Sequence, residues 1–378
     1  MLLTIVLAAD AALDAGSVAS HHNRQWVLSS TAQPKPQIPS HPYDGKLPSY
    51  AGLTLSSDGT ILYGTTMFGG DNNKGTVFAL GGALHYQLLH QFTVGFPDDG
   101  SAPQAGLVLS ADGQTLYGTT SAGDNHDNGT VFAVSTSGDN VFYRVLNRFG
   151  GAANDDGSQP LANLILSSDG TTLYGTTGHG GAPYTLFDGS VILIPGNGTV
   201  FALSTAGLDY KLLHTFIDFS HSGGGADGFA PFAGLVLSGQ WLYGTTFAGS
   251  PITSGSVFAV NTNGDGSDDE SWPPPAYSIL HSFTGIPGVS AGNDGANPPQ
   301  SASLAYVNAS PHPRMYGTTA TGGDNGIGTL FVLTQVTPPS MQVRNKPHSG
   351  VQAAAVEVAY DDPTLTFILE SALAPSGP

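Results

Sequence analysis

The chain has 378 residues, of which 40% are hydrophobic and only 10% are charged. Its formal charge of −18 repels a phosphate backbone, which argues against nucleic acid as a partner. It contains no cysteine, which excludes disulfides, thiolate zinc sites and a cysteine nucleophile. The 52 glycines, together with many Ser, Thr, Asn and Pro residues, indicate short strands joined by tight turns.

Residues 1–20 form the first segment. Leu2–Ala9 is apolar, and "SVAS" (Ser17–Ser20) supplies small residues of the kind that precede a signal-peptidase cut. No Lys or Arg precedes the run, however, and Asp10 and Asp14 interrupt it. Two interpretations stay open, a shortened secretion signal or a plain N-terminal extension. No stretch of the sequence has the length and apolarity of a membrane span.

A repeated unit follows. The phrase YGTT occurs five times, and each copy is preceded by a DGxxP loop and followed by a Gly-rich loop and a GTVF-like run. Four copies continue into a run that ends at Phe, such as "YQLLHQF" (Tyr86–Phe92). The tyrosines of YGTT are Tyr63, Tyr117, Tyr174, Tyr243 and Tyr316, and the aspartates of DGxxP are Asp44, Asp99, Asp156, Asp227 and Asp294.

These runs predict strands. They are short, rich in β-branched and aromatic residues, and bounded by Gly, Asn or Asp, which is typical of strands joined by tight turns. Gly64 and its counterparts stand inside the apolar pattern, where they would weaken a helix. Each unit is therefore predicted to be a four-stranded antiparallel meander, and the chain an all-β protein.

Five such meanders in series can cover one another's faces as blades around an axis or as a linear stack. The fifth unit lacks its last strand, since Gln335 runs into "VTPPS", whereas "RQWVLSS" (Arg24–Ser30) precedes the first unit as an orphan strand. This favours a five-bladed β-propeller over residues 21–335, closed by Arg24–Ser30 as the last strand of the fifth blade. A six-bladed ring that uses the C-terminal strands stays open as an alternative.

The units resemble the GloVer-type tandem repeat, whose hallmark is a YGTT strand, a GG loop and a GTVF strand. The resemblance covers about residues 39–333. This repeat is carried by "choice-of-anchor" bacterial proteins, so the resemblance implies a propeller-like fold and a secreted or cell-surface location. It implies no particular activity. The chain departs from the family at its C-terminus, because no apolar helix followed by basic residues is present there.

Residues 336–378 are predicted to form a linker and a two-stranded hairpin. The linker is "VTPPSMQVRNKPHSG", and the strands are "VQAAAVEVAY" (Val351–Tyr360) and "PTLTFILES" (Pro363–Ser371). The hairpin either packs on the propeller or pairs its open edges with another molecule.

The repeated Asp and His residues are candidates for chemistry. The five DGxxP aspartates would gather at one end of a ring, where they could bind a cation, but Asp before Gly commonly accepts hydrogen bonds from turn amides. His90, His214 and His281 recur in separate units, which predicts inter-blade hydrogen bonding rather than one zinc site. A role repeated in every blade indicates architecture for both sets.

The stretch "NTNGDGSDD" (Asn261–Asp269) has oxygen-bearing side chains at alternate positions. This spacing is typical of a calcium loop and resembles the calcium-binding hairpin loops of integrin-type propellers. Trp272 stands where an EF-hand needs Glu, so an EF-hand is excluded. Calcium is therefore the one candidate cofactor, with an ordinary polar turn as the alternative. The candidate ligands are Asn261, Asn263, Asp265, Ser267 and Asp269.

Three functions are compatible with the sequence, and we expect a non-catalytic, extracellular or cell-surface binding module for carbohydrate or protein. Exposed aromatics such as Phe68, Phe247 and Trp272 would supply the contacts. The second is a structural subunit of an extracellular assembly that self-associates through its terminal segments. The third is a glycoside hydrolase or lyase, which needs carboxylates at unlike positions, whereas those of the repeats are alike.

Overall fold

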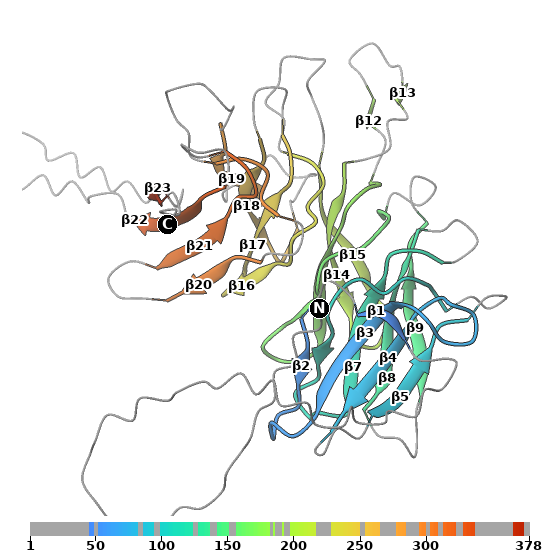
Figure 1. Ribbon diagram of the computed structural model, residues 1–378. Helices are drawn as coiled ribbons and strands as arrows, with labels where there is room; N and C mark the ends of the chain where they lie inside the picture. Colours follow the sequence, from blue (N-terminus) through green and yellow to red (C-terminus); the bar gives the residue numbers. More distant parts are fainter. Residues whose placement is uncertain are drawn as a thin grey trace, which may run out of the picture. The chain divides into compact units, whose positions relative to one another are not determined.

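The computed structural model describes eighteen stretches of the chain between residues 45 and 373. They are residues 45–48, 52–81, 86–93, 99–123, 128–136, 142–150, 156–181, 184–185, 191–192, 197–216, 228–249, 254–264, 277–284, 295–299, 303–308, 313–322, 328–336 and 366–373. All regular elements in these stretches are β-strands, as predicted (Figure 1). In the part of the chain described, no helix has the length and apolarity to cross a membrane.

Each of the five units forms one antiparallel sheet, and the five sheets follow one another in chain order (Figure 1). Sheet 1 contains β2 (Thr54–Leu55), β3 (Leu62–Phe68), β4 (Thr76–Leu80) and β5 (Tyr86–Gln91), with β1 (Lys46–Pro48) also on β3. Sheet 2 contains β6 (Val108–Leu109), β7 (Thr115–Thr120), β8 (Thr130–Ser135) and β9 (Tyr143–Arg148).

The remaining three sheets repeat this order. Sheet 3 contains β10 (Ile165–Leu166), β11 (Thr172–Thr177), β14 (Thr199–Ser204) and β15 (Tyr210–Thr215), and β12 (Tyr184–Thr185) and β13 (Val191–Ile192) pair separately. Sheet 4 contains β16 (Val236–Ser238), β17 (Trp241–Thr246), β18 (Ser256–Asn261) and β19 (Tyr277–Ser282). Sheet 5 contains β20 (Ala305–Val307), β21 (Arg314–Thr318), β22 (Leu330–Val336) and β23 (Thr366–Leu373).

The pairing of YGTT with GTVF explains why both phrases recur. In sheet 2, Gly118 lies opposite Phe132, and a Cβ on Gly118 would stand 2.5 Å from the Phe132 ring. The same pairing places Gly64, Gly175, Gly244 and Gly317 under Phe78, Phe201, Phe258 and Phe331. Glycine is needed at this position because the aromatic ring from the neighbouring strand fills the space that a side chain would occupy.

The threonines of the two phrases close the same strand pair. Thr120 Oγ1 lies 2.8 Å from Thr130 Oγ1 and also donates to the carbonyl of Ala122. Equivalent pairs at 2.8 or 2.9 Å occur in the other four sheets. Because these hydroxyls are buried, their mutual hydrogen bonds satisfy groups that would otherwise lose water.

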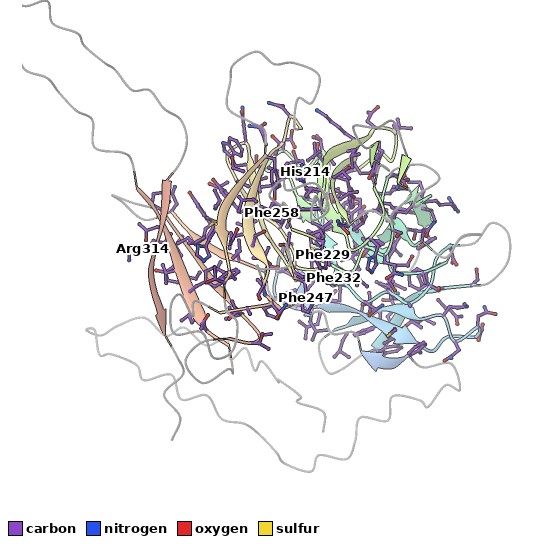
Figure 2. All side chains as sticks on the ribbon, turned by 90° about the horizontal axis from the view of Figure 1, so that it is seen from above. His214, Phe229, Phe232, Phe247, Phe258 and Arg314 are labelled. Atoms are coloured by element: carbon purple, nitrogen blue, oxygen red, sulfur yellow. The ribbon has the colours of Figure 1, made fainter. Side chains whose placement is uncertain are left out.

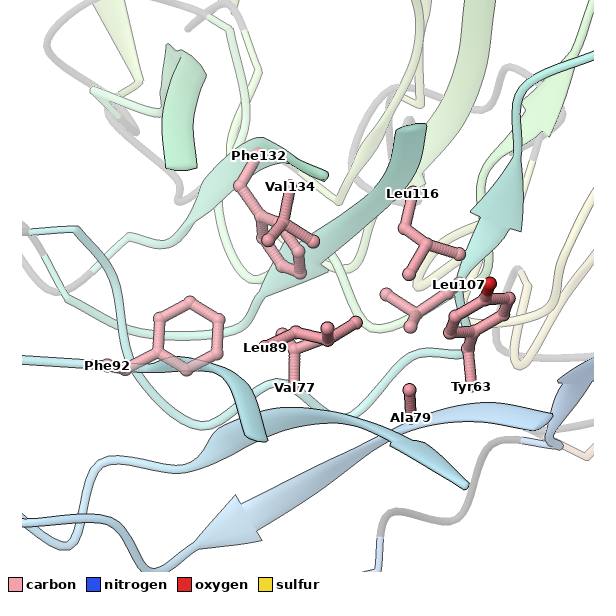
Figure 3. Close-up of a cluster of buried hydrophobic side chains, with 9 residues drawn as sticks. All are labelled: Tyr63, Val77, Ala79, Leu89, Phe92, Leu107, Leu116, Phe132 and Val134. Atoms are coloured by element: carbon pink, nitrogen blue, oxygen red, sulfur yellow. The ribbon is translucent and has the colours of Figure 1, made fainter. Parts of the chain in front are cut away.

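The core lies between consecutive sheets. The first of four buried clusters joins sheet 1 to sheet 2, and Figure 3 shows its side chains meeting from the two sheets. It contains Tyr63, Val77, Ala79, Leu89 and Phe92 of sheet 1 with Leu107, Leu116, Phe132 and Val134 of sheet 2. Three further clusters of the same make-up join sheets 2 and 3, 3 and 4, and 4 and 5.

The fourth strand of sheet 5 differs from the sequence-based prediction. That prediction placed Arg24–Ser30 at this edge, but the strand that pairs with β22 is β23, in a register from Leu330↔Leu373 to Val336↔Thr366. Arg24–Ser30 and Val351–Tyr360 lie outside the described residues. The sequence pattern favoured Arg24–Ser30 because it precedes the first unit as an orphan strand, but an open edge can pair with any strand-forming run, and Thr366–Leu373 is such a run as well.

The pairing of β23 also differs from that of the fourth strands in sheets 1 to 4. In sheets 1 to 4 the third and fourth strands shift register between the Val and the Phe of GTVF, as at Val131/Phe132. In sheet 5 the shift falls between Val332 and Leu333, later in the third strand. Thr366–Leu373, most of which was predicted to lie in a separate C-terminal hairpin, therefore completes the fifth sheet without copying the repeated strand.

Candidate functional site

Four of the five repeated tyrosines belong to the buried clusters between consecutive sheets. The Tyr63 hydroxyl bonds to Thr136 of the next sheet, and Tyr117 bonds to Thr205 in the same way. Burial raises the pKa of both phenols, and it raises the pKa of Tyr243 to about 12. Tyr174 repeats this pattern in sheet 3, while Tyr316 of sheet 5 is half-buried.

Two DGxxP aspartates lie in the described residues, and both join consecutive units. Asp99 accepts the backbone N–H of Thr93 at 2.8 Å, and its other carboxylate oxygen lies 2.8 Å from His90 Nε2. Asp156 accepts the N–H of Gly150 at 2.9 Å. The donors belong to the preceding unit, rather than to the turn that follows as the sequence suggested. The other three aspartates, Asp44, Asp227 and Asp294, lie outside the described residues.

Two of the three repeated histidines stack on a tyrosine of the next sheet. The His90 ring stacks on Tyr143 of sheet 2 with centroids 3.7 Å apart, and His214 stacks on Tyr277 of sheet 4 at 3.8 Å. His281 packs edge-on against Phe283. In the described part of the chain, no group of three His, Asp or Glu residues is arranged to hold a metal ion.

The predicted calcium loop is described only at its start. The Asn261 side-chain oxygen accepts the N–H of Asn263 at 2.9 Å, and Lys211 Nζ donates to the Asn263 carbonyl. This is the geometry of a polar turn at the end of β18, with a lysine beside it. Asp265, Ser267 and Asp269 lie outside the described residues, so the calcium site remains a prediction.

At one end of each sheet, the DGxxP segment pairs through a β-bridge with the residues that follow YGTT. We call this end of the sheets the loop end. The bridging pairs are Ser101↔Ala122, Ser158↔His179, Phe229↔Ala248 and Ala296↔Thr321, and Lys46↔Phe68 takes this place in sheet 1. The backbone is the same in each sheet while the side chains differ. A fixed frame with varied side chains is how many folds carry binding sites.

At the loop end, one residue of the DGxxP segment has a strained backbone conformation. In four units the residue before the DGxxP proline has a positive φ, between 53° and 56°. Its N–H donates to a carbonyl of the preceding unit, as Ala102 does to Lys74, and its carbonyl accepts the N–H of the residue after YGTT, as from Ser121. These bonds hold a conformation that non-glycine residues rarely adopt. The four residues are Ala102, Gln159, Ala230 and Asn297.

Sheets 3 and 4 place aromatic side chains at the loop end. The Phe232 ring of sheet 4 lies 5.8 Å from the His179 ring of sheet 3 and 6.2 Å from the Phe247 ring, measured between centroids. We call His179, Phe232 and Phe247 the aromatic cluster. Figure 2 labels Phe232 and Phe247 side by side, with Phe229 next to them. Phe232 is buried, Phe247 is half-buried and His179 is exposed.

Gly178 makes room for this cluster. Met67, Ser121, Phe247 and Ala320 occupy its position in the other four sheets, whereas a Cβ on Gly178 would stand 2.3 Å from Phe232 Cε1. The signal was present in the sequence, because unit 3 alone has Gly after YGTT and unit 4 alone has Phe after the DGxxP proline. Sequence reasoning singled out Phe68, Phe247 and Trp272, of which Trp272 lies outside the described residues, but missed Phe232 and His179.

Sheet 5 adds polar groups at the loop end. Thr321 Oγ1 donates to Asn297 Oδ1 at 3.0 Å, and Asn297 Nδ2 donates to the Phe247 carbonyl at 3.1 Å. Thr321 is exposed and Asn297 is half-buried. Aromatic faces beside amide, hydroxyl and imidazole groups can hold a ligand with both apolar faces and hydroxyls. The described residues of sheets 3 to 5 therefore present a mixed aromatic and polar surface at the loop end.

Five consecutive antiparallel sheets built from five copies of one unit define a repeat-containing, β-propeller-like protein. Residues 39–220 match the family model of the Gloeobacter/Verrucomicrobia repeat, and the chain carries this repeat, in agreement with the resemblance of its YGTT and GTVF phrases. The match covers the first three units. The fourth and fifth lie beyond it and form sheets with the same order of their first three strands.

Several solved structures are similar to the chain at low sequence identity. A chain of the nidogen/laminin complex has 13% identity and a TM-score of 0.42, over 75% of this chain and 74% of that one. The Cellvibrio cellulosa α-L-arabinanase complexed with arabinohexaose has 11% identity and a TM-score of 0.37, over 78% and 94%. An ancestral GH74 enzyme has 14% identity and a TM-score of 0.42, over 76% and 34%. A search of curated proteins found no match.

Proposed function

We propose that the protein is a non-catalytic binding module of the cell surface or extracellular space that binds carbohydrate at the loop end of sheets 3 to 5. The single observation that supports this most is the aromatic cluster, in which Phe232 of sheet 4 rests on Gly178 of sheet 3. The face of a sugar ring is apolar and packs on aromatic rings, while its hydroxyls need amide, hydroxyl and imidazole partners. A protein ligand is the alternative occupant.

The repeated aspartates among the described residues favour binding over hydrolysis. Asp99 and Asp156 are each bonded to a backbone N–H of the preceding unit, and Asp58, Asp112 and Asp169 are bonded within their own turns. A glycoside hydrolase instead needs two carboxyl groups across a cleft, one as acid and one as base or nucleophile. Repeated aspartates with repeated structural bonds do not supply that asymmetry.

For the architecture we propose one ring of five blades. Five sheets of at least four strands, joined in series by four buried interfaces, support this count. Because β23 completes sheet 5, it is not available as part of a sixth blade, as the alternative required. The blade count can be measured by electron microscopy of the purified protein, where a six-fold projection would contradict it.

The repeats supply matched variants for testing carbohydrate binding. Phe247→Ala gives sheet 4 the residue that sheet 5 carries as Ala320, and His179→Ala gives sheet 3 the residue that sheet 4 carries as Ala248. We expect each to weaken binding about 10-fold or more, because a stacked aromatic contributes about 1–3 kcal/mol at a binding surface. Binding would be measured by glycan array and then by calorimetry on the best glycan.

The control is Phe68→Ala, which makes the same change at the loop end of sheet 1 and should leave affinity within about 2-fold. All three variants should keep the wild-type melting temperature within a few degrees, because their replacements occur elsewhere in the same frame. Equal affinity of Phe247→Ala and wild type would show that the ligand lies elsewhere. Absence of binding to every glycan, together with specific capture of a protein, would favour the protein ligand.

Calcium remains a proposal of its own. Asp265 and Asp269 are the charged residues among the predicted ligands, and bound calcium would stabilise the turn after Asn261, because a ligand that binds only the folded state raises its stability. Titration followed by differential scanning calorimetry should show a rise in melting temperature that Asp265→Asn with Asp269→Asn abolishes. An unchanged melting temperature at millimolar calcium would leave an ordinary polar turn.

A further inference from the structure

Positively charged residues are almost absent from units 3 to 5. Between residues 149 and 335 the only Lys or Arg residues are Lys211 and Arg314, although Asp recurs throughout this segment. The whole chain carries a formal charge of −18. A negatively charged ligand of these three units could therefore find a cation at two residues only, and the positions of these two residues decide whether it can be recognised.

Lys211 and Arg314 both lie at the opposite end of the sheets from the loop end. Arg314 begins β21 and Thr318 ends it, so the length of the strand separates Arg314 from the loop end. β18 begins at the loop end, and the turn that follows it at the other end contains Asn263. Lys211 Nζ donates to the carbonyl of Asn263 in that turn. Neither cation is placed to contact a ligand at the aromatic cluster.

The loop end of sheets 1 and 2 differs in this respect. Lys46 pairs with Phe68 there, and the carbonyl of Lys74 accepts the N–H of Ala102. The segments that form this part of the loop end therefore carry two lysines, whereas the corresponding segments of units 3 to 5 carry none. An acidic ligand would find cations at sheets 1 and 2 rather than at the aromatic cluster.

The chemistry of the aromatic cluster also disfavours an anion. The face of an aromatic ring carries partial negative charge, so the C–H groups of an apolar sugar face pack on it whereas an anionic group is repelled. The polar groups that the described residues place beside the rings are the amide of Asn297, the hydroxyl of Thr321 and the imidazole of His179. A carboxylate, sulfate or phosphate bound here would lose water without gaining the guanidinium or ammonium partner that usually replaces it.

We propose that the loop end of sheets 3 to 5 binds uncharged glycans and excludes acidic ones, which carry uronate, sulfate or phosphate groups. This inference rests on the proposed function, carbohydrate binding at the aromatic cluster, and adds the chemical class of the sugar. The selectivity comes from the missing cations and the negative charge of the chain. Binding is then insensitive to salt, because there is no ion pair for salt to screen.

Pairs of polymers that share one backbone test this proposal. Hydroxyethylcellulose is compared with carboxymethylcellulose, and dextran with dextran sulfate, on an array that also holds neutral and acidic oligosaccharides. The full chain is applied at about 0.05 M and about 0.5 M NaCl. We expect binding to uncharged glycans that changes less than about 2-fold with salt and is at least about 10-fold weaker for the acidic member of a pair. Phe247→Ala should weaken this binding.

A variant that adds one cation tests the cause of the selectivity. Ala320 is exposed beside Thr321, and its N–H donates to the carbonyl of Asn297 at 2.9 Å. Ala320→Lys should strengthen binding of the acidic polymers about 10-fold at low salt and lose this gain at high salt. Ala320→Gln, the matched control, adds similar length without charge and should give no gain. Equal binding of acidic polymers by the two variants would show that missing cations are not the cause, which would overturn the proposal.

The remaining outcomes separate this inference from the proposed function. Preference for acidic glycans that Phe247→Ala weakens would overturn the inference and leave carbohydrate binding at the aromatic cluster intact. Acidic glycans that are lost in Lys46→Gln with Lys74→Gln, but kept in Phe247→Ala, would move the site to sheets 1 and 2 and overturn both. Silence on every glycan would refute the proposed function, and this inference with it. Wild-type melting temperatures would show that the variants are folded.

Discussion

The strands of YGTT and GTVF and the loop end of sheets 3 and 4 differ in which of their features recur from unit to unit. In the strands, repeated residues touch one another: Gly118 faces Phe132, and Thr120 bonds to Thr130. At the loop end the backbone bonds recur but the side chains change from sheet to sheet. Comparison of the five units therefore separates residues that build the sheets from residues that are candidates for function. The aromatic cluster is recognised because its residues differ from those at the same positions in the other units.

The largest expected effect is on the repeated strands. Gly118→Ala would place a Cβ 2.5 Å from Phe132 and 2.8 Å from Leu107, and we expect a loss of about 2–3 kcal/mol from the free energy of unfolding. The control is Gly52→Ala, because no atom lies within 4 Å of a Cβ placed there. Urea unfolding measures both. Equal stability of the two variants would show that the Gly–Phe pairing is not what the repeat preserves.

A smaller effect is expected at the loop end. Gly178→Ser introduces the residue found at Ser121 but drives a side chain toward Phe232, so we expect a loss of about 1–2 kcal/mol. Phe232→Ala removes the obstacle, and the double variant should be more stable than the sum of the two single losses predicts. A double-mutant cycle measured by urea unfolding gives the coupling. Strict additivity would mean that the two residues do not meet.

The smallest effect is confined to alkaline pH. Burial, and then the neighbouring Tyr306, raise the pKa of Tyr243 from 10.0 to about 12. A group with a raised pKa contributes stability that is complete below its unfolded pKa and is lost as pH rises through its folded pKa. The free energy of unfolding should therefore fall between about pH 10 and 12, and Tyr243→Phe should reduce that fall. Absorbance at 295 nm reports the phenolate; titration of all tyrosines near pH 10 would contradict the burial of Tyr243.

Much of this protein could be predicted from its sequence, because the pattern repeats on a local scale. The alternation around Leu116 and Tyr117, the turn residues such as Asp112 and Gly113, and five copies of one phrase predicted antiparallel sheets in series. Each sheet forms from residues close in the chain, so local preference and tertiary packing agree. The family match to residues 39–220 confirms that reading of the repeat.

Tertiary structure alone decided which distant residues meet. Two apolar segments could complete sheet 5, and the structure pairs Thr366–Leu373 with β22, although the sequence pattern favoured Arg24–Ser30. It also brought Phe232 onto Gly178, across a boundary between units. A strand pattern specifies which face is apolar but not which edge or neighbouring sheet will cover it, because backbone hydrogen bonds and apolar contacts are the same for any partner of suitable shape.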